Sequence, residues 1–213
     1  IVNHYLDGGW FPRGGTGVIA NEICKTIKQH GGDVLVAKKV NKILTNNGRV
    51  YGVKMENGDE IICDTVVSGA GLRNTFDKLV DSSRKTQIYK DMLKNMPPSV
   101  QHIYCFVKLD GDPRKLNLKS CNYWIYPHGD YDKLNEEFLD DPLNAPMPLF
   151  MGFSCMKDTE WSDKYPGVSN AIILTTAKKE WFEAWEDERC MKRGVDYEDF
   201  KKQIGERMLE EGL

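Results

Sequence analysis

Two Asn-Gly pairs constrain the fold of this chain more than any other feature. Asn47-Gly48 and Asn57-Gly58 both lie between short β-prone segments, and Asn-Gly is the strongest short hairpin signal because both residues tolerate a positive φ. Between the two pairs, Tyr51, Val53 and Met55 alternate with less apolar residues, as in a strand with one buried face. The pattern predicts a three-stranded antiparallel meander that begins at about residue 39.

A glycine-rich turn and an apolar-periodic helix precede the meander. The turn occupies residues 8–17, and Ile19, Ile23 and Ile27 then recur at the spacing of one helix face. Gly31-Gly32 accepts the left-handed conformation that a helix end needs. We therefore predict a helix over residues 16–30, and short apolar strands at residues 34–36 and 65–67.

The pattern after Gly71 is one of mixed helices and strands. Helices are predicted over residues 76–96, 131–139, 179–188 and 197–211, and strands over residues 101–109, 122–126, 149–155 and 170–176. The sequence contains no repeat and no low-complexity segment, so this half is predicted to be a mixed α+β layer.

Charge and cysteine spacing exclude several classes of protein. A net charge of -3 gives no basic balance and argues against a nucleic-acid partner. The apolar runs are much shorter than the roughly 18 residues of a membrane-spanning helix, and no targeting segment is visible. No two of the six cysteines are closer than 16 positions, and the four histidines show no ligand spacing. A metal site is not expected.

The segment of the turn that most resembles a motif does not meet the requirements of a primary pyrophosphate-binding loop. Residues 15–20 match the G-x-G-x-x-A form of the dinucleotide fingerprint, which requires a preceding strand and an acidic residue about 20 positions later. Pro12 interrupts any such strand, and residues 34–39 contain no acid. A tight turn packed on a helix is the simpler interpretation, although a helix N-terminus also favours anionic groups.

Taken in order, residues 8–71 resemble the flavin-dependent amine oxidase and phytoene desaturase/carotenoid isomerase superfamily. The segments that carry the resemblance are WFPRGG (10–15), GGDVLV (31–36), VNKIL (40–44), GRVYGV (48–53) and VVSGAG (66–71). In the second half KDTEW (157–161), YPGVS (165–169), EWFEAW (180–185) and KRGVDY (192–197) resemble the retinol saturase branch.

The resemblance implies a fold of the α/β and α+β classes. It combines an incomplete FAD-binding Rossmann-type portion of the glutathione-reductase-like kind, which contains the antiparallel meander, with a mixed α+β substrate domain. The implied division is a substrate-side segment and glycine turn (1–15), the central FAD-binding part (16–71) and a substrate-domain portion (72–213). The family's N-terminal GxGxxG and its C-terminal flavin-covering segment have no counterpart in this sequence. We therefore expect a fragment of a longer protein, inactive alone, with an incomplete FAD site.

Site residues follow from the resemblance position by position. It implies an adenine-end contact for Val40, adenosine-diphosphate contacts for Ser68, Gly69, Ala70 and Gly71, and a flavin-side position for Arg13, Gly14 and Gly15. The aromatic strand suggests Tyr123, Trp124 and Tyr126 as an apolar wall for a long polyene, with ordinary core packing as the competing interpretation. No catalytic residue is assigned.

The resemblance implies an FAD-dependent oxidoreductase that reduces, desaturates or isomerises a conjugated double bond of a retinoid- or carotenoid-like polyene. It also implies NAD(P)H as an electron source, contact with a membrane surface and association with the endoplasmic reticulum. One alternative is a stand-alone lipid-binding or interaction module without flavin catalysis. A second alternative keeps the fold and changes the substrate, as in an amine oxidase.

Overall fold

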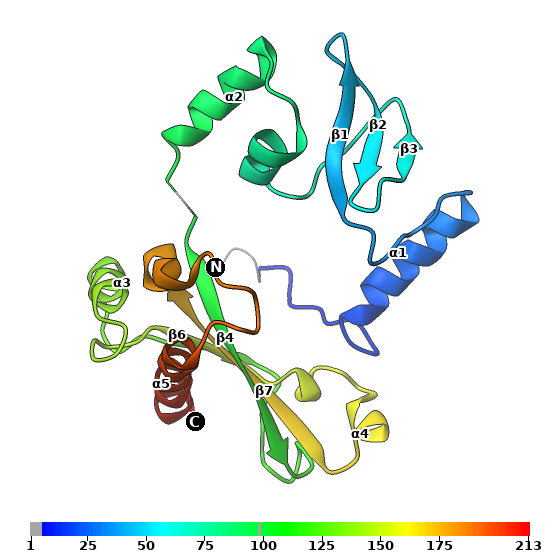
Figure 1. The fold of residues 1–213 in the computed structure, drawn as a ribbon. Coiled ribbons are helices and arrows are strands. Elements are labelled where there is room, and N and C mark those ends of the chain that lie inside the picture. The colour runs from blue at the N-terminus through cyan, green and yellow to red at the C-terminus, as the bar shows by residue number, and fades with distance from the viewer. Residues whose placement is uncertain (1–5, 98) are drawn as a thin grey trace. The chain divides into compact units, whose positions relative to one another are not determined.

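A computed structural model describes residues 6–97 and 99–213, which fall into two compact units. Unit 1 comprises Ile1–Thr26 and Ser99–Leu213, and unit 2 comprises Ile27–Pro98. Each unit contains one antiparallel sheet (Figure 1). The division implied by the family, at residues 15 and 71, stays a prediction.

The meander of unit 2 is confirmed. It consists of β1 (Val40–Asn46), β2 (Arg49–Met55) and β3 (Glu60–Ile62), each antiparallel to the next. Asn47 and Gly48 have φ values of 50° and 74°, so both central residues of the first turn adopt the positive φ of a type I′ hairpin. Ile43, Leu44 and Met55 are buried in this unit.

The helix predicted over residues 76–96 is divided into two elements. A short π-helical segment, η2 (Asn74–Leu79), is followed by α2 (Arg84–Lys94). The side chain of Ser83 accepts the Thr86 N–H, and the Ser83 N–H donates to Thr86 Oγ1. This capping box starts a new helix at residue 84 and explains why the first one does not continue.

The two apolar strands predicted beside the meander, at residues 34–36 and 65–67, are wrong for the described chain. Neither segment is paired as a strand, and Val36 and Val67 are 82% and 92% exposed. A strand requires a hydrogen-bonded neighbour, and no described strand pairs with either segment. The helix α1 (Gly17–Gln29) is confirmed, but its apolar residues Ile19 and Ile23 are also exposed.

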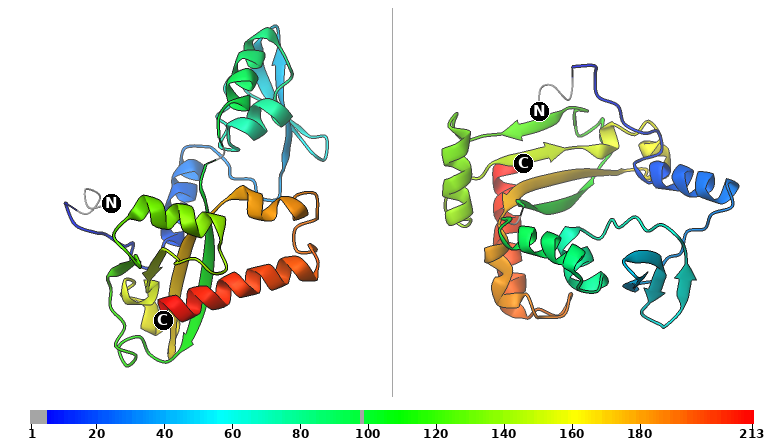
Figure 2. Two further views of the ribbon diagram at one scale, coloured as in Figure 1. Left: turned by 90° about the vertical axis from the view of Figure 1, so that its left-hand side faces the viewer. Right: turned by 90° about the horizontal axis from the view of Figure 1, so that it is seen from above.

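Unit 1 is built on a four-stranded antiparallel sheet in the order β4-β7-β6-β5 (Figure 2). The strands are β4 (Gln101–Asp110), β5 (Asn122–Ile125), β6 (Leu149–Gly152) and β7 (Val168–Ala177). On β7 every second residue is buried, from Ser169 to Ala177. This period of two shows that one face of the sheet is packed against the core.

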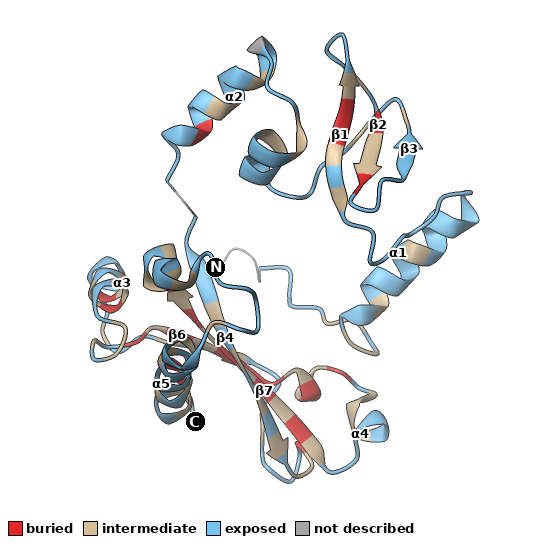
Figure 3. Cartoon of the chain, viewed as in Figure 1, coloured by how far each residue is buried: buried red, intermediate tan, exposed pale blue. Residues whose placement is uncertain are grey.

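Two helices supply that core, α3 (Tyr131–Asp140) and α5 (Val195–Gly212). Phe138 from α3 and Ile204 and Met208 from α5 pack with Ile173 of β7 and Leu149 of β6 in one buried cluster. Figure 3 colours buried residues red, and in unit 1 red segments are visible on the strands of this sheet and on α3.

Short helical turns complete unit 1, and they shorten two predicted elements. They are η3 (Ser154–Met156), α4 (Trp161–Lys164) and η4 (Lys179–Trp185). The predicted strand 149–155 ends at Gly152, and the predicted helix 179–188 is a 3₁₀ segment that ends at Trp185. Three residues per turn align Phe182 with Trp185, and both rings contact Phe200 of α5.

Candidate functional site

The face of the unit 1 sheet opposite the core presents a row of apolar side chains. Trp124, Phe150, Leu174 and Tyr104 are successive cross-strand partners from β5 to β4. Cross-strand partners share a face, so the four side chains form a row across all four strands. The Trp124 and Phe150 rings meet edge to face at 4.9 Å.

A second register row widens this surface at its β4 end. Ile172 of β7 pairs with Phe106 of β4, and each lies two positions along its strand from the pair Leu174 and Tyr104. The Tyr104 and Phe106 rings stack with their centroids 6.0 Å apart. Phe106 is 76% exposed and Trp124 is 44% exposed, whereas Phe150, Ile172 and Leu174 are half-buried. We call this set of residues the apolar strip: Tyr104, Phe106, Trp124, Phe150, Ile172 and Leu174.

Polar groups meet over Gly152 of β6, which pairs with Ile172 in the second register row of the apolar strip. A Cβ at Gly152 would lie 3.0 Å from Asn122 Oδ1, 3.3 Å from Lys157 Nζ and 3.7 Å from Phe150 Cε1. Lys157 Nζ donates a hydrogen bond to Asn122 Oδ1. The absence of a side chain at Gly152 therefore leaves the space that the ammonium group approaches, on the face of β6 that carries Phe150.

Lys157 is a half-buried cation. Burial disfavours the ammonium form and lowers the pKa of Lys157, with a smaller opposite effect from the neighbouring Cys121. Within residues 6–97 and 99–213, no carboxylate forms an ion pair with it. Sequence reasoning missed this pair because Asn122 and Lys157 are 35 positions apart, and nothing local signals that they meet.

The three aromatic residues proposed to line the substrate do not share one face. Trp124 belongs to the apolar strip, whereas Tyr123 faces the core and meets Phe153 edge to face at 6.1 Å. Tyr126 follows the end of β5 and packs on Tyr131 of α3 with ring centroids 4.7 Å apart. The period of two along β5 separates Tyr123 from Trp124.

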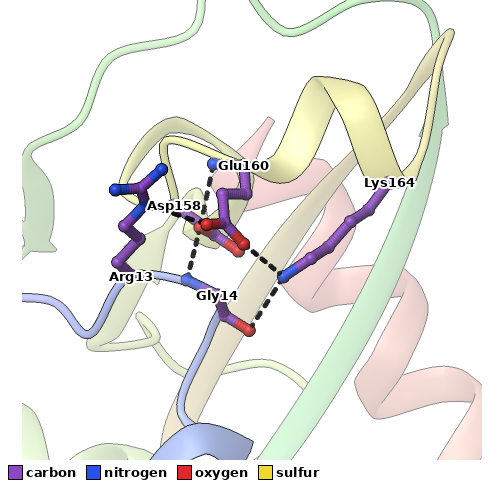
Figure 4. A network of polar contacts seen from close by, with 5 residues as sticks. All are labelled: Arg13, Gly14, Asp158, Glu160 and Lys164. Carbon is purple, nitrogen blue, oxygen red and sulfur yellow. Dashed lines mark hydrogen bonds and ion pairs between the residues drawn. The ribbon is translucent and has the colours of Figure 1, made fainter.

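The glycine turn of unit 1 is anchored by a polar network (Figure 4). The Gly14 N–H donates to Asp158 Oδ1 at 2.9 Å, and Arg13 Nε contacts Glu160 Oε1 at 2.8 Å. Lys164 Nζ contacts Glu160 Oε2 at 3.0 Å and Gly14 O at 3.4 Å. Gly14 and its neighbour Gly15 have φ values of 88° and 91°, a conformation that favours glycine. The turn is thus held to the segment that precedes α4.

Asp158 is the buried centre of this network. Burial acts to raise its pKa, but backbone N–H donors from Glu160 and Gly14, together with nearby Lys164 and Arg13, outweigh that effect and lower it. Glu160 also has a lowered pKa, because Lys164 and Arg13 bind its carboxylate. Both acids are therefore held in the charged form.

In unit 2, Val40 begins β1 beside a cavity of about 540 Å³. Seven residues line the cavity: Leu35, Ala37, Lys38, Lys39, Met55, Glu56 and Asn57. Met55 is also the cross-strand partner of Val40. A cavity at the start of this strand is compatible with the adenine end of a dinucleotide that the resemblance implies there.

The small-residue segment at residues 68–71 lies in an open loop. Ser68 Oγ and Thr75 Oγ1 are 2.7 Å apart, and the Ala70 N–H donates to Ser68 Oγ at 3.4 Å. Gly71 has a φ of 87°, and a Cβ at Gly69 would meet no atom within 4 Å. The loop leaves room for close approach of a ligand to its backbone, as a dinucleotide would require.

Two features are absent from residues 6–97 and 99–213, a metal-binding cluster and a membrane-spanning helix. No three histidine, cysteine, aspartate or glutamate side chains gather there in a way that could hold a metal ion. No helix among these residues has both the length and the apolar character needed to cross a membrane.

Comparison with known proteins identifies the relatives of this chain. A family model described as flavin containing amine oxidoreductase matches residues 2–193. All-trans-retinol 13,14-reductase of Homo sapiens is 37% identical over 219 residues, which cover 98% of this chain and 36% of that protein. The chloroplastic prolycopene isomerase of Daucus carota is 32% identical over 207 residues, which cover 95% of this chain and 29% of that protein. The chain thus spans about a third of the length of these curated relatives.

A solved structure shows the same fold. An oxidoreductase from Methanosarcina mazei superposes with a TM-score of 0.56 at 17% sequence identity, over 94% of this chain and 39% of that one. At this identity the likeness supports the fold alone.

Proposed function

The chain belongs to the flavin-containing amine oxidoreductase family, and from that premise we propose that it is part of an FAD-dependent oxidoreductase acting on a retinoid- or carotenoid-like polyene. The reaction is reduction, desaturation or isomerisation of a conjugated double bond. Two relatives support this choice, since one is named for the reduction of retinol and the other for the isomerisation of prolycopene.

The apolar strip is the observation that carries the proposal. Three strand spacings of about 4.8 Å give the row from Trp124 to Tyr104 a length of about 14 Å. A polyene of retinoid length is apolar, flat and comparable in length, and a longer carotenoid would extend beyond the row. Burial of exposed aromatic and aliphatic surface would drive its binding, and the rigid sheet would hold the chain extended.

Cofactor and substrate have separate places in the proposal. When bound, FAD supplies the hydride chemistry of the reaction. We propose that Val40 and the loop of Ser68 to Gly71 hold its adenosine end, and that the turn of Arg13 to Gly15 lies on the flavin side. The apolar strip binds and orients the polyene and excludes water from it. NAD(P)H as the electron source and the endoplasmic reticulum as the location are proposed from the family resemblance alone.

Product analysis tests the proposed reaction. The full-length protein, loaded with FAD, is incubated without oxygen with NADPH or dithionite and with all-trans-retinol or a carotenoid. We expect a polyene of shortened conjugation whose mass has increased by two hydrogen atoms, or an isomer of unchanged mass. If every polyene is recovered unchanged under these reducing conditions, the proposed reduction and isomerisation are wrong.

The same preparation separates the two alternatives. Polyene binding by a protein that takes up no flavin would favour the lipid-binding module. Release of hydrogen peroxide on addition of amines, with polyenes unchanged, would favour an amine oxidase.

A variant of the apolar strip tests the binding surface. Trp124→Ala removes the aromatic ring at its β5 end, and we expect the Kd for retinol to rise about tenfold, since one aromatic contact is worth about 1 to 2 kcal/mol. Tyr51→Ala is the control, because Tyr51 is 41% exposed, close to the 44% of Trp124, but lies on the meander of unit 2. Retinol fluorescence titration measures both. Equal affinities of the two variants would remove the apolar strip from the proposal.

A further inference from the structure

Among the residues that the structure describes, Lys157 has no carboxylate partner, which is unexpected for a cation beside an apolar surface. Lys157 Nζ lies over Gly152, on the face of β6 that also carries Phe150, and Phe150 pairs with Trp124 and Leu174 of the apolar strip. Because Gly152 pairs with Ile172, and Ile172 with Phe106, the ammonium group marks the β6 end of the second register row of the apolar strip.

The hydrogen bonding of Lys157 leaves capacity for a ligand. An ammonium group has three donors, and the bond to Asn122 Oδ1 engages one of them. Desolvation of a charged group is costly unless oxygen acceptors replace the lost water. A hydrocarbon laid over this ammonium would impose that cost, whereas a ligand with an oxygen atom at the same place would offset it.

Gly152 is the third part of this arrangement. Any larger residue would place a Cβ 3.3 Å from Lys157 Nζ and 3.0 Å from Asn122 Oδ1. Because Gly152 lies within β6 and lacks a positive φ, backbone strain does not explain the glycine. The glycine is explained by the space above it, which Lys157 Nζ and Asn122 Oδ1 border.

We propose that Lys157, positioned by Asn122 over Gly152, binds the terminal oxygen of a linear polyene, whose chain then lies along the apolar strip. This inference rests on the proposed function and adds a determinant of specificity to it. The ammonium group donates to the oxygen, so the surface distinguishes an oxygen-terminated retinoid from a hydrocarbon carotenoid. A terminal alcohol and a terminal carboxylate share this chemistry, and they are separate arms of the test.

Binding measurements with three probes test the inference. All-trans-retinol, all-trans-retinoate and lycopene are titrated in detergent against the full-length, FAD-loaded protein and its Lys157→Met variant. We expect the variant to weaken retinol binding roughly tenfold or more, as for loss of a charged hydrogen bond, with lycopene affinity unchanged. Lys115→Met replaces an exposed lysine of the same unit and is expected to change neither. A larger loss for retinoate than for retinol would identify an acid as the preferred end group, and the reverse an alcohol.

The second variant, Gly152→Ala, keeps Lys157 but occupies its space, so it carries the test if Lys157→Met does not fold. Folding is judged by thermal unfolding and flavin content. The inference is overturned if a folded variant, Lys157→Met or Gly152→Ala, binds retinol as tightly as the wild type. It is also overturned if the variant loses affinity for retinol and lycopene equally. Both results leave the polyene proposal standing. A wild-type protein that binds none of the three probes would instead refute the proposed function, and the inference with it.

Discussion

Asp158 joins two segments that lie far apart in the sequence. Its Oδ1 accepts the N–H of Gly14, 144 positions away, and the N–H of Glu160. The ion pair between Arg13 and Glu160 is largely exposed, and such pairs contribute little. At the scale of the residue, the position of the glycine turn therefore depends on Asp158 more than on the charges around it.

Replacement of Asp158 tests this dependence. We expect Asp158→Ala to lower the free energy of unfolding by about 1 to 3 kcal/mol, because two backbone donors lose their acceptor. Asp163→Ala is the control, since Asp163 belongs to α4 and is exposed. Urea unfolding of both variants measures the difference. Equal stabilities would show that the Gly14 turn is held by other contacts.

The charged form of Asp158 also predicts a dependence on pH. Its pKa in the folded protein is below the ordinary value of 3.8, so the unfolded chain binds the proton more readily. The contribution to stability is fully present above that value and is lost as the pH falls through the lowered pKa. As the pH falls, the free energy of unfolding of the wild type should therefore decrease by more than that of Asp158→Ala. Parallel curves of unfolding free energy against pH for the two proteins would contradict this.

Close backbone packing fixes the meander at the scale of the element. A Cβ at Gly52 would lie 2.5 Å from the carbonyl oxygen of Ile61, the next strand's backbone. We expect Gly52→Ala to displace β3 from β2 and to raise amide hydrogen exchange at residues 60–62. Gly205→Ala in α5 meets no atom within 4 Å and should leave stability equal or slightly higher, as alanine favours helix. Unchanged exchange in Gly52→Ala would contradict the observed register.

The elements that could be predicted from the sequence are those with local causes. The Asn47-Gly48 turn sets the first hairpin and its register, and the apolar period sets α1 and most strands of unit 1. The segments at 34–36 and 65–67 have strand composition but no described partner, because pairing is not a local property. Lys157 over Gly152 was not predictable for the same reason: the contact depends on how β5 and β6 pair.

At the scale of the whole molecule, the two units, each with one antiparallel sheet, are assigned different parts of one proposed reaction. Unit 2 carries Val40, the cavity beside it and the loop at 68–71, which we assign to the adenosine end of FAD. Unit 1 carries the glycine turn, which we assign to the flavin side, and the apolar strip with Lys157, which we assign to the polyene. The chain spans 36% of the length of the human retinol reductase it resembles, so the reaction is proposed for the full-length protein.

Anaerobic reoxidation of the flavin tests the central claim most directly. The full-length, FAD-loaded protein is reduced to completion, excess reductant is removed, and all-trans-retinol or a carotenoid is added while the flavin absorbance is followed. A polyene reductase predicts recovery of oxidised flavin absorbance in step with the polyene consumed, and slower recovery in Trp124→Ala. Flavin that stays reduced with every polyene, yet reoxidises normally in air, would contradict a reductase.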